Sequence, residues 1–249
     1  MLSINNHLVM ACHITGVYDV NRNNLLQDDD YTLVQGWVES MAALHLMGII
    51  FHNNFTNETC EKYKNDYVHF VKIAYDAKFN PNVYRYFVYR DFLRTYAPRI
   101  QSLFITDVSD VVAIQNPFIH PLFTNNPTAL FCGDEPKTLD NEWMKDHATH
   151  LRNKIADYAH YENTHQRETL LNCGIIGGNL PIMQDFIEKL CLIHQQYNHD
   201  NLSAYTGDMG AFNYLARTHF NDQIRHGAPV NTVFKMYEND RTDCWFRHK

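Results

Sequence analysis

Two carboxylates, Asp107 and Asp110, follow an apolar run in the stretch FITDVSDVVAIQNPF, residues 104–118. Residues three apart point to opposite faces of a regular strand, so both acids can reach one ligand only if the strand ends near Asp107 and the chain bends. Buried carboxylates need a cation, hydrogen-bond donors or water around them. A divalent cation such as Mg²⁺ or Mn²⁺ suits such oxygens and is often shared with substrate phosphates. The spacing alone favours a structural pair, in which Asp107 caps a turn and Asp110 is solvated.

Alternating strands and helices precede this acid pair. Short apolar runs predict strands at 7–15, 49–55, 67–75 and 100–106, and apolar spacing predicts helices at 31–48, with Gly48 as the C-cap, and at 82–98. The alternation predicts one α/β domain over residues 1–249, with a mostly parallel central sheet flanked by helices. Ligands gather at the carboxyl ends of the strands in such sheets, and Asp107 lies at one of these ends.

The second half of the chain is less regular. We expect a strand at 128–133, polar helical structure from about 140 to 165, helices at 181–197 and 207–220, and a late strand at 230–237. Between them, TLLNCGIIGG (169–178) is apolar, is broken by Asn172 and ends in two glycines. Asp208 opens the helix at 207–220, where a carboxylate can cap the helix or, if it faces a cleft, take part in chemistry.

Composition excludes several classes of function. The net charge of −7, from 21 basic and 28 acidic residues, argues against a broad nucleic-acid surface. The 15 histidines are scattered, and the six cysteines form no C-x-x-C pair, so we read most of them as buried hydrophobes in a reduced protein. The start lacks a basic and apolar leader, and no apolar run reaches the roughly 20 residues of a membrane helix. We therefore expect a cytoplasmic protein without a transmembrane segment.

An apolar strand, two acids, a short apolar run and Asn-Pro-Phe together resemble the metal-binding acidic motif of nucleotide-sugar glycosyltransferases with the GT-A fold. Those enzymes often carry D-x-D, whereas this chain has D-V-S-D, and we favour Asp110 as the second metal ligand. HLVMACHIT (7–15) resembles the nucleotide-binding first strand of that fold. LLNCGIIGG (170–178), GDMGAFNYLA (207–216) and the final FRHK resemble later segments of it, in the same order.

The resemblance implies a GT-A-type nucleotide-binding fold, a divalent cation (Mn²⁺ or Mg²⁺), a nucleoside-diphosphate sugar donor, and a glycan or other hydroxyl acceptor. It also implies a set of site residues, which are Ala11, His13, Thr15, Arg85, Asp107 and Ser109 for the donor, Asp107, Asp110 and His248 for the metal, Asn172, Gly174 and Gly177 on the acceptor side, and Asp208 for catalysis.

Structural roles remain open for these residues. Arg85 could line a solvated helix face, Asn172 could be a satisfied core amide, and Asp208 could be only an N-cap. His248 lies one residue from the end of the sequence, where disorder is common, and this slightly favours a role outside the site.

Two other functions also remain open. One is a phosphohydrolase with an aspartate nucleophile, which usually carries its D-x-D on the first strand. The other is a nucleotide-sugar or glycan-binding module without turnover. No G-x-x-x-x-G-K-[ST], G-x-G-x-x-G, G-x-S-x-G or H-E-x-x-H motif is present. A phosphate ligand would therefore depend on a cation and on arginine, which agrees with a metal-dependent hexosyl- or pentosyl-transferase of carbohydrate biosynthesis.

Overall fold

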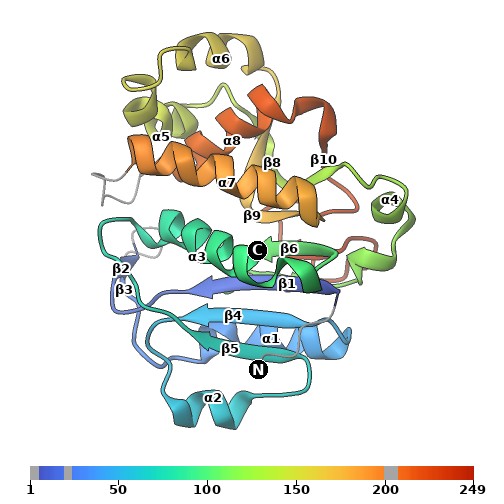
Figure 1. The fold of residues 1–249 in the computed structure, drawn as a ribbon. Helices are drawn as coiled ribbons and strands as arrows, with labels where there is room; N and C mark the ends of the chain where they lie inside the picture. The colour runs from blue at the N-terminus through green and yellow to red at the C-terminus, as the bar shows by residue number, and fades with distance from the viewer. Residues whose placement is uncertain (1–5, 20–23, 199–206) are drawn as a thin grey trace.

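The computed structural model describes residues 6–19, 24–198 and 207–249. A seven-stranded sheet forms the centre, in the order β10-β8-β9-β6-β1-β4-β5 (Figure 1). Four of its adjacent pairs are parallel, and β9 is antiparallel to both of its neighbours. The predicted α/β class with a mostly parallel sheet flanked by helices is confirmed.

The elements have the following bounds. The strands are β1 His7–His13, β2 Tyr18–Asp19, β3 Asn24–Leu25, β4 Gly48–His52, β5 Val68–Lys72, β6 Ser102–Thr106, β7 Val111–Ala113, β8 Leu130–Thr138, β9 Thr169–Asn179, β10 Ile224–His226 and β11 Phe246–His248. The helices are α1 Thr32–Ala43, α2 Asn57–Tyr63, α3 Pro81–Tyr96, α4 Pro121–Thr124, α5 Glu142–Arg152, α6 Tyr158–His165, α7 Leu180–Tyr197 and α8 Asp208–His219.

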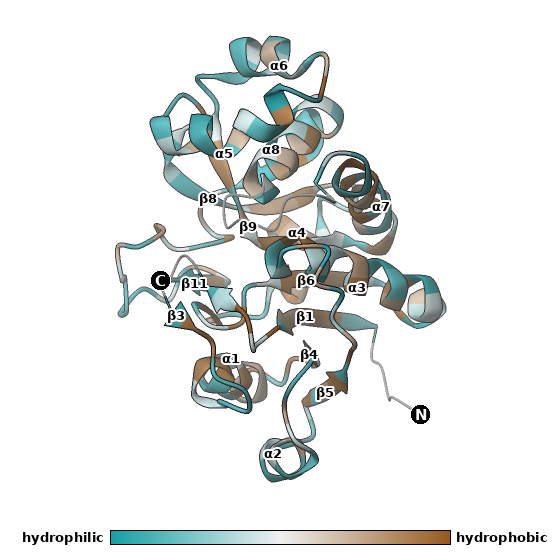
Figure 2. Ribbon diagram, turned by 90° about the vertical axis from the view of Figure 1, so that its left-hand side faces the viewer, coloured by the Kyte–Doolittle hydropathy of each residue, from teal (hydrophilic) through white to brown (hydrophobic). Residues whose placement is uncertain are grey.

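Side-chain alternation along the strands divides the core into two layers. Leu8 and Met10 of β1 pack with α3, α7 and α8 on one face, whereas Val9 and Ala11 pack with α1 and the C-terminal segment on the other. Both faces of β1 are buried, which explains its continuous apolar run. Figure 2 shows the hydrophobic strands inside and hydrophilic surface on outer helices such as α2 and α6.

Two expectations for the elements need correction, and a third, the polar helical stretch, is confirmed. Helix α1 ends at Ala43, and Gly48 is the first residue of β4 instead of a C-cap; a Cβ at Gly48 would lie 2.7 Å from the Trp37 ring. The strand expected at 128–133 continues to Thr138. The polar stretch from 140 to 165 forms two helices, α5 and α6. These differences come from tertiary contacts and from local irregularity that apolar periodicity does not report.

The late strand expected at 230–237 is wrong. Only Asn231 makes a β-bridge there, to Phe246, and the residues that follow form turns. Lys235 and Tyr237 have positive φ angles of 61° and 49°, which no strand accommodates. No helix in the described ranges is long and apolar enough to cross a membrane.

Candidate metal centre between two pockets

The candidate ligand-binding edge of the sheet lies between β1 and β6. The chain leaves β1 for β4 on one side and later returns to β1's other side with β6. Ligands of open parallel sheets bind beyond the carboxyl ends of strands at such a reversal. Since β1 ends at His13 and β6 ends at Thr106, the crevice lies beside His13 and Asp107.

Asp107 and Asp110 converge because β6 ends at Thr106, directly before Asp107. The amide of Asp107 donates to the carbonyl of Gly174 (2.8 Å), and residues 108–110 then bend before β7 begins at Val111. The bend removes the opposite orientation that a regular strand would give to residues three apart. Asp107 and Asp110 therefore reach the same space.

His248 joins this pair through the pairing of two short strands. β11 runs antiparallel to β7, with His248 opposite Val111, and the amide of Lys249 donates to the carbonyl of Asp110 (2.9 Å). The His248 amide also donates to Thr232 Oγ1 (3.2 Å). His248 is only 1% exposed, so the expectation of a disordered end outside the site is wrong. One ligand atom from each of Asp107, Asp110 and His248 lies within 4.8 Å of the others.

This group fits a divalent cation. Burial lowers the pKa of His248 to about 4, which keeps the imidazole neutral at pH 7, as a metal ligand must be. Its Nδ1 is buried without a hydrogen-bond partner in the described part of the chain. Two carboxylates with one imidazole suit Mn²⁺, and the carboxylates also suit Mg²⁺. Gly174 leaves the space open, because a Cβ there would lie 2.7 Å from His248 Cε1 and 2.8 Å from Asp107 Oδ2.

Arg85 places a positive charge beside the acid pair. It projects from the first turns of α3, is 8% exposed, and forms an ion pair from Nη1 to Asp107 Oδ1. Its Nε donates to the carbonyl of Asn82 (3.0 Å), and Nη2 lies 3.3 Å from Cys173 Sγ. Asp107 thus gives one oxygen to Arg85 and turns the other toward Gly174. A solvated helix face, the structural role considered for Arg85, is excluded by its burial.

Two pockets meet at the acid pair. The smaller, of about 160 Å³, is lined by His13 and Ser109, by Tyr18 of β2, and by the start of α3. The larger, of about 700 Å³, lies toward β8, β9 and α8. Both are lined by a shared set, namely Asn82, Arg85, Asp107 and Asp110. The start of α3 presents the positive end of its helix dipole to the smaller pocket, which favours an anion there, although Pro81 has no N–H and the Asn82 and Val83 amides already donate to Asn80.

Asp208 lines the larger pocket and is not the helix N-cap. The N-cap of α8 is Gly207, with a φ of 72°, and no side chain caps this helix end. Asp208 is 6% exposed, and its Oδ2 accepts a weak hydrogen bond from the thiol of Cys173 (3.7 Å). The role of a simple cap is therefore wrong for this carboxylate, which is buried at the wall of the cleft.

Asn172 connects the metal-ligand group to a second buried carboxylate. Its Oδ1 accepts from the amide of Gly174 (2.7 Å), and its Nδ2 donates to Glu135 Oε1 (2.8 Å). Glu135 lines the larger pocket, and burial raises its pKa. Sequence reasoning missed Glu135, although it belongs to an acid pair, Asp134 and Glu135, that follows the apolar run 128–133 as Asp107 follows its own. His147 and Trp143 of α5 line the same pocket and were also missed.

Three expected site residues lie elsewhere. Ala11 is fully buried in the core layer under α1. Thr15 is buried beside the smaller pocket, where its hydroxyl donates to Asp28 Oδ1 (3.0 Å) and its amide to Asn53 Oδ1 (3.0 Å). Gly177 pairs with Phe104, and a Cβ there would lie 2.2 Å from that ring. Each of the three supports the sheet or loop that carries the site, and none lines either pocket.

No protein-family model matches the chain, and no curated protein matches it.

Proposed function

We propose that the protein is a metal-dependent glycosyltransferase that moves a sugar from a nucleoside-diphosphate sugar to a hydroxyl acceptor. One observation carries this proposal: the candidate metal ligands Asp107, Asp110 and His248 lie where two pockets meet. A transferase needs two substrates on either side of the reacting bond, and a cation between them can serve the diphosphate. A cytoplasmic location remains a further prediction.

The smaller pocket suits the nucleotide half of the donor. The N-terminal turn of α3 and the guanidinium of Arg85 supply positive charge for phosphate oxygens. His13 and Ser109 provide polar groups at the ends of β1 and β6. A bound Mn²⁺ or Mg²⁺ would neutralise the diphosphate as it leaves.

The larger pocket suits the acceptor, which we expect to be a glycan. In an inverting reaction a carboxylate takes the proton of the attacking hydroxyl, and Asp208 and Glu135 both line this pocket. Asp208 is our candidate for this base. In a retaining reaction it would instead hold hydroxyls of the donor sugar. The transition state would be oxocarbenium-like in either case, as in glycoside hydrolysis.

A thermal-shift screen of nucleoside diphosphates and their sugars, with Mn²⁺ and with EDTA, tests the proposal. A ligand at about 100 times its Kd adds about 2.7 kcal/mol to the free energy of unfolding. We expect stabilisation by one donor with Mn²⁺, followed by acceptor-dependent release of nucleoside diphosphate. Release of inorganic phosphate from a phosphomonoester would favour a phosphohydrolase, and stabilisation without any release would favour a binding module.

A further inference from the structure

Exposed apolar side chains gather around the mouth of the larger pocket. Tyr237 is 63% exposed and lines the larger pocket together with Trp143 of α5, and Met236, the residue before Tyr237, is 66% exposed. Eight large apolar residues are exposed in the described ranges, and these three and Val233 are half of them. Such clustering on one face indicates an interaction surface, since scattered single residues would need no explanation.

Three lysines surround the same mouth. Lys137, Lys235 and Lys249 line the larger pocket, are exposed, and form no ion pair within the part of the chain that the structure describes. By contrast, Lys64, Lys78, Lys145 and Lys189 each have an acidic partner. The three lysines therefore place exposed positive charge at the mouth of a pocket whose wall carries the carboxylates of Glu135 and Asp208. We call Lys137, Trp143, Lys235, Met236, Tyr237 and Lys249 the cleft rim.

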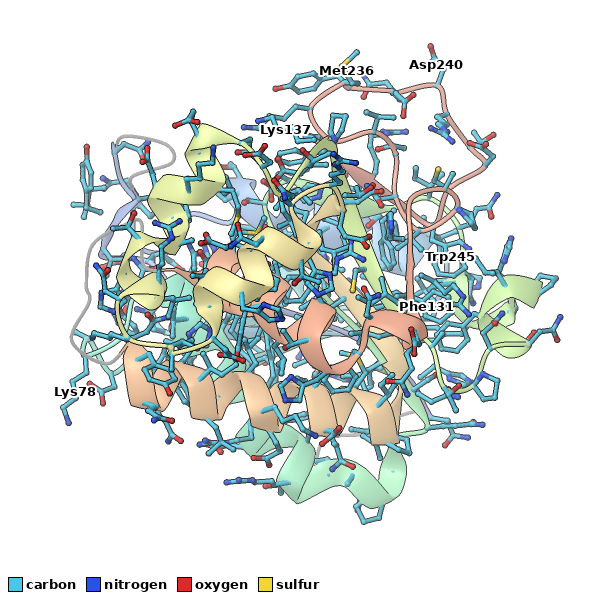
Figure 3. All side chains as sticks on the ribbon, turned by 90° about the horizontal axis from the view of Figure 1, so that it is seen from above. Lys78, Phe131, Lys137, Met236, Asp240 and Trp245 are labelled. Atoms are coloured by element: carbon cyan, nitrogen blue, oxygen red, sulfur yellow. The ribbon has the colours of Figure 1, made fainter. Side chains whose placement is uncertain are left out.

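The loop that carries Met236 is braced. Glu238 Oε2 accepts from the amide of Val233 (2.8 Å) and from Arg241 Nη1 (3.1 Å), and Arg247 Nη2 donates to the carbonyl of Asn239 (2.6 Å). Figure 3 shows Met236 and Asp240 on a loop that stands out from the body, with Lys137 near its base and Lys78 on the far side.

The backbone of this loop is strained at its apolar tip. Lys235 and Tyr237 on either side of Met236 have positive φ angles, a conformation that costs energy in residues other than glycine. The surrounding structure therefore holds the two apolar side chains outward at a cost, which is typical of a functional segment.

We propose that the cleft rim docks on an anionic lipid surface. Apolar and aromatic side chains that enter the headgroup region, ringed by lysines, are the pattern that binds peripheral proteins to membranes. Unpaired lysines favour anionic lipid, and the net negative charge of the chain would otherwise repel such a surface. Docking in this way would turn the larger pocket toward the bilayer. The inference is independent of the proposed enzyme activity.

Partition of the full chain onto vesicles of phosphatidylcholine, with and without phosphatidylserine, tests this inference. We expect binding only with phosphatidylserine, weakening as salt is raised. Met236→Ser with Tyr237→Ser should weaken partition about tenfold or more, because both side chains lose their burial in the interface. Lys235→Gln should weaken it about fivefold, and Asp240→Asn on the same loop should strengthen it about fivefold.

Matched controls lie away from the rim. Ile119 is 76% exposed on another segment, and Lys78 is an exposed lysine on the far side, so Ile119→Ser and Lys78→Gln should leave partition unchanged. The inference is overturned if the chain binds neither vesicle, binds both equally, or loses binding in the controls as much as in the rim variants. Self-association that depends on Met236 and Tyr237, without vesicle binding, would also overturn it and assign the rim to a second copy. Partition is measured without turnover, so none of these results bears on the glycosyltransferase proposal.

Discussion

The two halves of the sheet build the site in different ways. The half formed by β5, β4, β1 and β6 is parallel and regular, and its strand ends contribute His13 and Asp107. The half formed by β9, β8 and β10 contains the antiparallel strand and shifts of register at Gly133 and beyond Asp134. The irregular half contributes Asn172 and Glu135. Regular pairing thus supplies a general ligand-binding edge, and the departures from it bring the groups that would act on an acceptor.

Two short paired strands, β7 and β11, join the two halves of the sheet. β7 continues from the acid turn, and β11 returns from beyond β10 to pair with it. Trp245 precedes β11, is fully buried, and packs against Phe131 of β8 (5.3 Å between ring centroids) and Phe104 of β6 (5.9 Å). Figure 3 shows Trp245 next to Phe131. Because the packing of Trp245 fixes the β7–β11 pair, His248 of β11 lies beside Asp107 and Asp110.

The largest expected effect concerns the two carboxylates of the irregular half. Asp208→Asn and Glu135→Gln keep side-chain shape, so the melting temperature should change little. If either carboxylate is the general base, its variant should lose turnover by about 10² or more. Burial raises the pKa of Glu135. If Glu135 is the general base, turnover should therefore be lost, as pH falls, at a higher pH than an ordinary glutamate would give. Normal turnover in both variants would show that neither Asp208 nor Glu135 is the general base.

Variants of Arg85 test whether the regular half of the sheet binds the donor. Arg85→Lys keeps the charge but loses the fork that spans Asp107, Asn82 and Cys173, and we expect donor affinity to fall about ten- to a hundredfold. Arg85→Ala should also destabilise the fold, because it removes the ion pair that the partly buried Asp107 makes with Arg85. Calorimetry of the donor nucleotide with Mn²⁺ measures the first effect. Unchanged affinity in a folded Arg85→Lys protein would leave Arg85 only a structural partner of Asp107.

Because of the buried His194 in α7, we expect the fold to lose stability at acidic pH. His194 is fully buried, stacks on Tyr86, and burial lowers its pKa to about 3. A folded pKa below the unfolded value of about 6.5 means that its stabilising contribution is complete above pH 6.5 and is lost as pH falls toward 3. At pH 5, roughly 1.5 pH units below the unfolded pKa, the free energy of unfolding should be about 2 kcal/mol lower than at pH 7. Urea unfolding at pH 7 and pH 5 measures it, and His194→Gln should show a smaller difference between the two.

Gly174 carries the smallest expected effect, on metal affinity. A Cβ on Gly174 would press on His248 and Asp107, so Gly174→Ala should weaken Mn²⁺ binding at least about tenfold. Gly36 in α1 is the matched control, because its added Cβ would meet only Val112 Cγ1 at 3.5 Å. Gly36→Ala should therefore leave Mn²⁺ affinity unchanged. Equal affinities in the two variants would show that the space above Gly174 does not hold the cation.

The sequence predicts the regular half well, for physical reasons. Strands β1, β4, β5 and β6 and helix α3 produce clear apolar runs or helical spacing, and the end of β6 before Asp107 followed from that pattern. The acid pair converges because the strand ends there, as the spacing required. The strand order and the antiparallel direction of β9 were not predictable, since pairing between distant segments leaves no local pattern.

The irregular half shows where local reasoning fails. His248 is ordered because of its pairing with Val111, a contact between residues far apart in the chain. The segment 230–237 is rich in β-branched and aromatic residues, as strands are, yet it forms turns and is held by Glu238 and Arg241. Asp208 was placed correctly at the start of a helix, but Gly207 is the N-cap, so the Asp208 side chain does not cap the helix. Each outcome depends on tertiary contacts instead of propensity.

Calorimetric titration of a nucleoside diphosphate, with Mn²⁺ and with EDTA, tests the central claim that Asp107, Asp110 and His248 hold a cation for the diphosphate. We expect binding to the unaltered protein only with Mn²⁺, and loss of that dependence in Asp110→Ala and in His248→Ala. Arg247→Ala, one residue away but directed to the carbonyl of Asn239, should behave as the unaltered protein. Equal nucleotide affinity in EDTA and in Mn²⁺ would contradict the claim.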